Sequence, residues 1–166
     1  MNLRANLLPA LVGVIVLALG FAVWSGLQAR ALSSGDNTAL VDAAESAEVS
    51  DQVGTGVKAI FSYDYANLAR TDRAAADVLT GEAVGQYRDE FTAARKRAED
   101  QKLVRTTTVR SIGVRELRGD DATLLLFLDQ QTLKPGGGAP ESAGAQLAVT
   151  ARRVDGRWRI SGLTAL

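Results

Sequence analysis

Acid–base chemistry in this chain would fall to aspartate, glutamate, lysine and tyrosine, because its 166 residues include neither histidine nor cysteine. Serine–histidine and cysteine–histidine catalytic pairs are therefore excluded. Zinc sites depend on the same two residue types, so nearly every transition-metal site is excluded with them. The missing cysteines also rule out disulfides and a lipidated cysteine.

The residues that retain some chemical interest are Tyr63, Asp64, Tyr65, Tyr87 and Trp158. In one hypothesis they line a cavity, and Asp64 acts there as a buried base. In the favoured alternative Tyr65, Tyr87 and Trp158 are core residues whose polar atoms find hydrogen bonds, and Asp64 bonds to the backbone or pairs with an arginine. We therefore predict no catalytic residue, and a pocket or a polar cluster in the core at these five positions.

No motif for a metal, a phosphate or a nucleic acid is present. The sequence lacks the Asp-x-Asp-x-Asp-Gly loop of calcium sites. Glycines 136–138 follow a proline and are not followed by Gly-Lys-Ser/Thr, so they predict a flexible turn. The 19 basic and 19 acidic residues cancel, which gives no indication of a nucleic-acid partner. We expect no cofactor and no metal.

The positioning elements begin with an apolar segment, residues 7–27, that carries no charge. At about 1.5 Å per residue it would span roughly 30 Å, the thickness of a bilayer core. A cleaved secretory signal is the alternative, but the apolar run is longer than the usual h-region. We predict a short N-terminus at residues 1–6, a transmembrane anchor at 7–27, a linker at 28–36 and one domain at 37–166.

Orientation rests on few charges. Arg4 precedes the apolar segment and Arg30 follows it, so the bias towards a cytoplasmic N-terminus is slight. We expect a single-pass protein of the cell membrane whose C-terminal domain lies outside the cytoplasm. The oligomeric state stays open.

Residues 37–102 have a helical pattern. Apolar residues recur at steps of three and four from Val49 through Phe61 to Leu68, with Tyr65 beside them and Ser34, Asp36 or Asn37 as the cap. Gly54 and Gly56 weaken this helix and mark close packing or a bend. A short helix is predicted at 73–79 with a cap at Thr71 or Asp72, then a break at Thr80-Gly81. A third helix is predicted at 82–100, with Ala83, Tyr87, Phe91 and Ala94 on one face.

Residues 103–166 predict four strands, at 103–117, 122–133, 145–154 and 157–161. The run Leu124-Leu125-Leu126-Phe127-Leu128 suggests a strand buried on both faces or nearly so. We predict a loose loop at residues 135–144 and a tight hairpin turn at Asp155-Gly156. Trp158 and Ile160 share one face of the last strand. The predicted class is α+β: about three helices packed on a curved, mainly antiparallel four-stranded sheet that forms a cone.

This arrangement resembles the actinobacterial Mce-associated membrane proteins, which have a nuclear-transport-factor-2-like (NTF2-like, or cystatin-like) cone. The resemblance rests on the anchor and on four further features: Ser62-Tyr63-Asp64-Tyr65-Ala66-Asn67-Leu68, Leu79-Thr80-Gly81, Tyr87 and the ending Val154-Asp155-Gly156-Arg157-Trp158-Arg159-Ile160-Ser161-Gly162-Leu163. It implies a non-enzymatic accessory protein that stabilises or assists a lipid transporter of the cell envelope, with Mce transporter subunits as partners.

Two other functions remain open. The cone could bind a small apolar ligand in its pocket. The chain also resembles the single-span cone proteins that act as scaffold subunits of type IV secretion machines. The anchor and fold would be alike in these cases, because a fold does not fix a function.

Overall fold

The computed structural model describes residues 37–40 and 42–166. The predicted anchor at 7–27, the linker and the candidate caps Ser34 and Asp36 lie outside the described residues. Among the helices of residues 37–40 and 42–166, none combines the length and the hydropathy that a membrane span requires.

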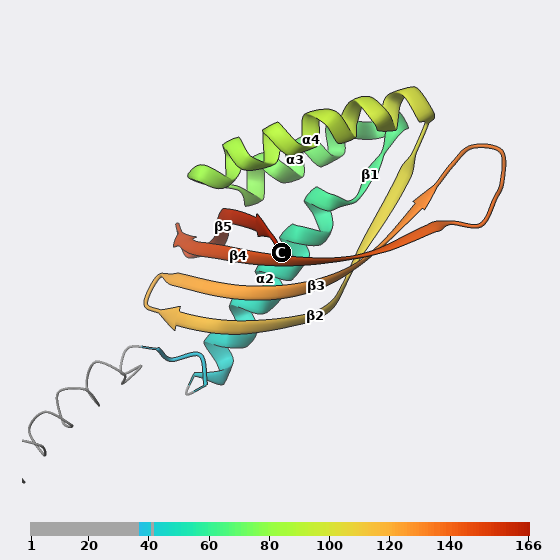
Figure 1. Ribbon diagram of the computed structural model, residues 1–166. Coiled ribbons are helices and arrows are strands. Elements are labelled where there is room, and N and C mark those ends of the chain that lie inside the picture. The colour runs from blue at the N-terminus through green and yellow to red at the C-terminus, as the bar shows by residue number, and fades with distance from the viewer. Residues whose placement is uncertain (1–36, 41) are drawn as a thin grey trace, which may run out of the picture. The chain divides into compact units, whose positions relative to one another are not determined.

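The described residues form three α-helices and a five-stranded antiparallel sheet with the strand order β1-β2-β3-β4-β5, which confirms the predicted α+β class. The elements are α2 (Ala43–Phe61), β1 (Tyr63–Asp64), the 3-10 helix η1 (Tyr65–Asn67), α3 (Leu68–Val78), α4 (Glu82–Gln101), β2 (Val104–Arg118), β3 (Asp121–Leu133), β4 (Glu141–Val154) and β5 (Arg157–Ala165). The sheet has one strand more than the predicted four, because the short strand β1 between α2 and α3 pairs with β2. In Figure 1 the three helices lie against the sheet, with α3 and α4 side by side.

Helix α2 begins later than predicted. Asp42 caps it, because its Oδ1 accepts a hydrogen bond from the Glu45 N–H at 2.8 Å. The predicted cap Asn37 has another role. Its side-chain oxygen accepts from the Leu117 N–H at 3.0 Å and its amide nitrogen donates to the Arg115 carbonyl at 3.0 Å. Asn37 therefore holds the segment before α2 against β2.

Helix α2 also ends before the predicted position, at Phe61 rather than near Leu68. The next residues form β1 and η1, and α3 begins at Leu68 with Asn67 as its N-cap position, so the predicted caps Thr71 and Asp72 are wrong.

Hydroxyls from three other elements donate to carbonyls at the end of α2: Tyr87 to Ile60 at 2.9 Å, Thr107 to Phe61 at 2.7 Å and Thr71 to Ser62 at 3.1 Å. These bonds satisfy carbonyls that a helix leaves unpaired at its C-terminus.

The third predicted helix is confirmed as α4. Gly81 precedes it at a φ of 56°, a conformation that glycine adopts without steric cost, so the predicted break at Thr80-Gly81 holds. Ala83 and Tyr87 are buried, and Phe91 packs against the core beside them.

Strand β3 is buried on one face only. Leu124, Leu126 and Leu128 are buried, whereas Leu125 is half-buried and the Phe127 side chain is 40% exposed. The prediction of burial on both faces is wrong, because the helices cover a single face of the sheet. The inner face packs on α2 through a cluster of fully buried side chains: Val49, Val53, Val57, Ile60, Leu117, Leu124, Leu126, Val149 and Ile160.

The β3–β4 hairpin is longer than predicted. Strand β4 begins at Glu141, which pairs with Thr132, so the connecting loop covers residues 134–140 rather than 135–144. An ion pair between Lys134 and Glu141 links the two ends of this loop. The predicted turn between β4 and β5 is confirmed, with Asp155 and Gly156 both at positive φ.

Candidate functional site

A cavity of about 240 Å³ lies between α4, the end of α2 and the inner face of β2, β3 and β4. Its apolar lining includes the aromatic rings of Phe61, Tyr63, Tyr87 and Phe91. Polar side chains, among them Glu90 and Arg105, also line it. Since binding pockets are mostly apolar with a few polar groups, this cavity is the first candidate for a functional site.

The four rings are packed against one another. The Tyr87 and Phe91 rings are stacked with centroids 4.9 Å apart. Phe61 meets Tyr87 edge-on at 6.2 Å, and Tyr63 meets Phe91 edge-on at 6.1 Å. Such pairs are favourable beyond their burial, so the rings form a rigid aromatic lining.

Tyr87 is held in its neutral form. Burial raises the pKa of its hydroxyl, the nearby charge of Asp72 raises it further, and Arg95 opposes the rise. The hydroxyl donates a 2.9 Å hydrogen bond to the Ile60 carbonyl. Tyr87 is therefore suited to structural support of the cavity and not to accepting a proton from a bound molecule.

Arg105 lies at the edge of the cavity, on β2. Its guanidinium carbon is 5.3 Å from the centroid of the Tyr63 ring, and its Nε donates to the Thr132 hydroxyl at 3.0 Å. Tyr63 and Arg105 are paired across β1 and β2, which explains why two residues so far apart in sequence are adjacent. A cation above an aromatic face is favourable.

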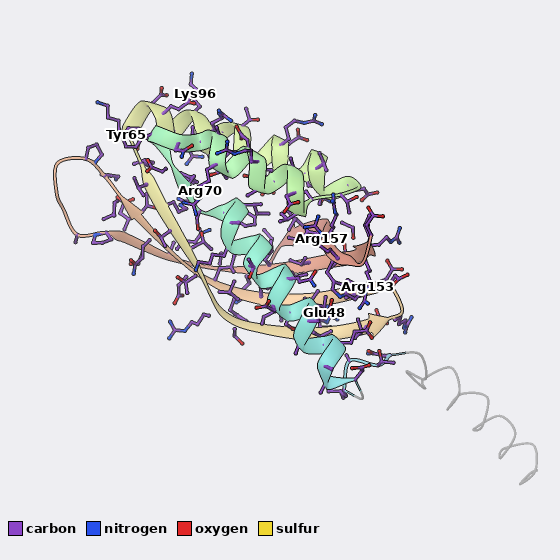
Figure 2. The ribbon with its side chains drawn as sticks, turned by 180° about the vertical axis from the view of Figure 1, so that it is seen from behind. Glu48, Tyr65, Arg70, Lys96, Arg153 and Arg157 are labelled. Carbon is purple, nitrogen blue, oxygen red and sulfur yellow. The ribbon has the colours of Figure 1, made fainter. Side chains whose placement is uncertain are left out.

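The same two residues line a second, more polar groove of about 550 Å³ between the end of α2, the start of α3 and the start of β2. Lys58 and Arg70 are also part of its lining. Figure 2 shows Arg70 where the end of α2 meets α3. Three cationic side chains therefore line this groove, which we call the basic groove. The cavity described above is the aromatic cavity.

Asp64 lines the basic groove but is exposed. Its Oδ1 accepts a hydrogen bond from the Ala66 N–H at 2.9 Å and caps η1. The hypothesis of a buried base at Asp64 is wrong in its premise, because the residue follows the end of α2 instead of lying within a helix on the core side. The structure shows the alternative prediction, in which the Asp64 carboxylate forms a hydrogen bond with a backbone group.

The five candidate residues do not form one cluster. Tyr63 and Tyr87 both line the aromatic cavity, and Tyr63 and Asp64 both line the basic groove. Tyr65 lies in η1 with 40% of its surface exposed (Figure 2), so the prediction that it packs beside Phe61 is wrong. Trp158 is buried on β5, where the guanidinium carbon of Arg153 lies 4.8 Å from its ring centroid. Its indole N–H has no hydrogen-bond partner among the described residues, so the prediction that it finds one is wrong.

Sequence reasoning missed three residues of this region: Lys58, Arg70 and Arg105. Phe91 was placed on the correct face of its helix but was not assigned to a pocket. Side chains two residues apart on a strand share a face, so Arg105 shares a face with Thr107, which is fully buried. This alternation was the signal in the sequence that Arg105 faces the interior of the domain. Among the described residues, no group of three or more acidic side chains could hold a metal ion.

Comparisons with known sequences place the chain near proteins without an assigned role. No family model matches it. Two uncharacterized proteins from two strains of Mycobacterium tuberculosis are each 32% identical to it over 111 residues, which cover 66% of this chain and 50% of the relative. The chain thus spans about half the length of the curated relatives it matches.

Solved structures share the fold at low sequence identity. An IcmL-like type IV secretion system protein from Legionella pneumophila aligns with a TM-score of 0.64 at 8% identity, over 72% of this chain and 91% of that one. The periplasmic domain of DotI aligns with 0.62 at 15% identity, over 71% and 92%. A periplasmic fragment of TraM aligns with 0.62 at 12% identity, over 72% and 96%. The described domain therefore shares its fold with these three solved chains.

Proposed function

We propose that this chain is a non-enzymatic accessory protein of a membrane-embedded envelope complex, with residues 37–166 outside the cytoplasm as an assembly domain. The observation that carries this proposal is the fold. It matches 91–96% of the length of three solved chains, two described as periplasmic and one as part of a type IV secretion system. The uncharged segment at 7–27 would supply the tether.

The aromatic cavity supports a role without catalysis. Among the described residues that line it, Glu90 is the only carboxylate, and it is exposed on α4. The Tyr87 hydroxyl is already bonded to Ile60. Catalytic carboxylates are typically tuned by burial, and the lining of the described cavity contains no buried carboxylate.

For the partner, the first candidate is an Mce-type lipid transport system, which the anchor and the Ser62–Leu68 motif favour. The second candidate is a secretion machine in which the domain would act as a scaffold, favoured by the likeness to the IcmL-like protein, DotI and TraM. Both candidates place the domain among other membrane and envelope proteins.

The test is a purification of the full chain in mild detergent from its native host, with mass spectrometry of the co-purified proteins. Recovery of Mce subunits or their permease supports the first candidate, and recovery of secretion subunits supports the second. Recovery of neither in repeated purifications contradicts both.

Two variants with equal side-chain exposure then locate the contact surface. Phe127 on the uncovered sheet face and Tyr65 at η1 are each 40% exposed. Loss of partner recovery with Phe127→Asp but not with Tyr65→Asp assigns the partner to the sheet face. The reverse result assigns it to the end of the molecule formed by η1.

A further inference from the structure

We propose that the aromatic cavity and the basic groove form one binding site for a single-chain amphiphile with an anionic head group. The apolar chain lies in the cavity and the carboxylate or phosphate head lies in the groove at Arg105. This goes beyond the accessory role, since it assigns a ligand to the domain and does not depend on which partner the protein has.

The size and lining of the cavity favour a short apolar chain. At about 240 Å³ it is larger than the apolar cavities of about 150 Å³ that take up one benzene molecule. Four packed aromatic rings contribute to its lining, so removing an alkyl chain from water into it is favourable. The volume suits one short alkyl chain or one substituted ring and is too small for a two-chain lipid.

Arg105 and Tyr63 lie between the two spaces and line both, so a head group bound at Arg105 would be next to a chain in the cavity. Its Nε is bonded to Thr132, and no carboxylate of the described residues forms an ion pair with its guanidinium. The outer guanidinium nitrogens are thus available. A half-buried guanidinium binds carboxylate and phosphate oxygens with strong, charge-assisted hydrogen bonds.

The charges around the site set the direction in which the amphiphile lies. Lys58 and Arg70 line the groove with Arg105, and neither forms an ion pair with a described carboxylate. The opposing charge in the groove is Asp64, which caps η1. On the cavity side Glu90, which repels an anion, lines the space together with Arg105. An anionic head is therefore favoured in the groove and disfavoured at the Glu90 side of the cavity.

The experiment uses the full chain in nanodiscs of zwitterionic phosphatidylcholine, because a detergent would itself compete for the cavity. A photoreactive diazirine analogue of octanoic acid is the probe, and mass spectrometry maps the labelled peptides. We expect labelling of α4 around Tyr87 and Phe91 and of β4 around residues 145–147. Labelling that does not enrich these peptides over the peptides of residues 116–124, which line neither space, overturns the proposal.

Competition of unlabelled compounds with the probe tests whether the site requires an anionic head group. Octanoate and octyl phosphate should displace the probe, and octanol should compete at least about tenfold more weakly, since charge-assisted hydrogen bonds are about twice as strong as neutral ones. Equal competition by octanol overturns the anionic head. Competition by inorganic phosphate as strong as that by octyl phosphate overturns the role of the cavity.

Two matched pairs of variants complete the test. Arg105→Gln should weaken octanoate binding about tenfold or more and leave octanol unchanged, whereas Arg115→Gln, on the same strand but outside both spaces, should bind like the wild type. Ala94→Trp fills the cavity and should abolish labelling, whereas the exposed neighbour Ala93→Trp should not. Wild-type binding by Arg105→Gln or by Ala94→Trp, in variants shown to be folded by circular dichroism, overturns the proposal.

The source of the amphiphile is a separate outcome. If the molecule extracted from protein purified from its host is a single-chain membrane lipid with an anionic head group, the membrane supplies it. If labelled octanoate binds equally well when the chain is held in lipid-free amphipol, the ligand can enter from solution. Both results are compatible with success or failure of the partner purification described above, so the two proposals can fail independently.

Discussion

The hydroxyl of Tyr87 on α4 donates a 2.9 Å hydrogen bond to the main-chain carbonyl of Ile60 in the last turn of α2. The two residues are both buried and both line the aromatic cavity. One bond therefore joins the two helices beside the proposed ligand site and satisfies a carbonyl that α2 leaves unpaired.

Replacing Tyr87 by phenylalanine should lower the free energy of unfolding by about 1–3 kcal/mol, because the buried Ile60 carbonyl loses its partner while the ring stays in place. Urea denaturation of the wild type and Tyr87→Phe measures the difference. Tyr65→Phe is the control, since Tyr65 is exposed, and should change stability by less than about 0.5 kcal/mol. Equal effects of the two substitutions would contradict the structural role of the bond.

The raised pKa of Tyr87 should make the free energy of unfolding fall as the pH rises above about 10. Burial raises the pKa of Tyr87 in the folded state above about 10, its value in the unfolded chain, so the unfolded state loses the proton first. Its stabilising contribution is complete below about pH 10 and is lost as the pH rises towards the folded pKa, by at most about 1.4 kcal/mol per pH unit. Urea denaturation at a series of pH values from about 9 to 11.5 should therefore show that the difference in free energy of unfolding between the wild type and Tyr87→Phe becomes smaller. A difference that stays constant over this range would contradict the raised pKa of Tyr87.

Adjacent residues on β3 should respond very differently to truncation. Leu126 is fully buried on the helix-covered face, so Leu126→Ala should cost about 2–5 kcal/mol. Phe127 is 40% exposed on the other face, so Phe127→Ala should cost clearly less, on the order of 1 kcal/mol. Thermal unfolding of both variants measures this, and similar losses would mean that something covers both faces.

Substitutions at Gly54 and Gly56, the two glycines of α2, should have opposite effects on the free energy of unfolding. A methyl group at Gly54 meets only the tip of Ile112 at 3.8 Å, so Gly54→Ala should stabilise by about 0.5–1 kcal/mol through helix propensity. At Gly56 the same carbon would lie 3.4 Å from Val78 and 3.5 Å from Ile160, so Gly56→Leu should overpack and cost about 1–3 kcal/mol. Chemical denaturation checks both, and a stabilising Gly56→Leu would refute the close packing inferred here.

Part of the candidate site was accessible from sequence. Tyr63 and Tyr87 are two of the five residues for which the sequence predicts a pocket or a polar cluster in the core, and both line the aromatic cavity. Arg105 was not proposed, because its role depends on the pairing of β1 with β2, which brings it against Tyr63. A two-residue strand leaves no periodic pattern in a sequence, so this pairing could not be predicted.

The sequence by itself determined the elements whose signals are local: the extent of α4, with its break at Gly81, and the hairpin turn at Asp155-Gly156 with Trp158 facing the core. The tertiary structure alone decided where α2 ends, because the hydroxyls that bond to Ile60, Phe61 and Ser62 come from α3, α4 and β2. It also decided that β3 is covered on one face. Local periodicity reports which residues are apolar, whereas the packing of distant elements fixes what each side chain meets.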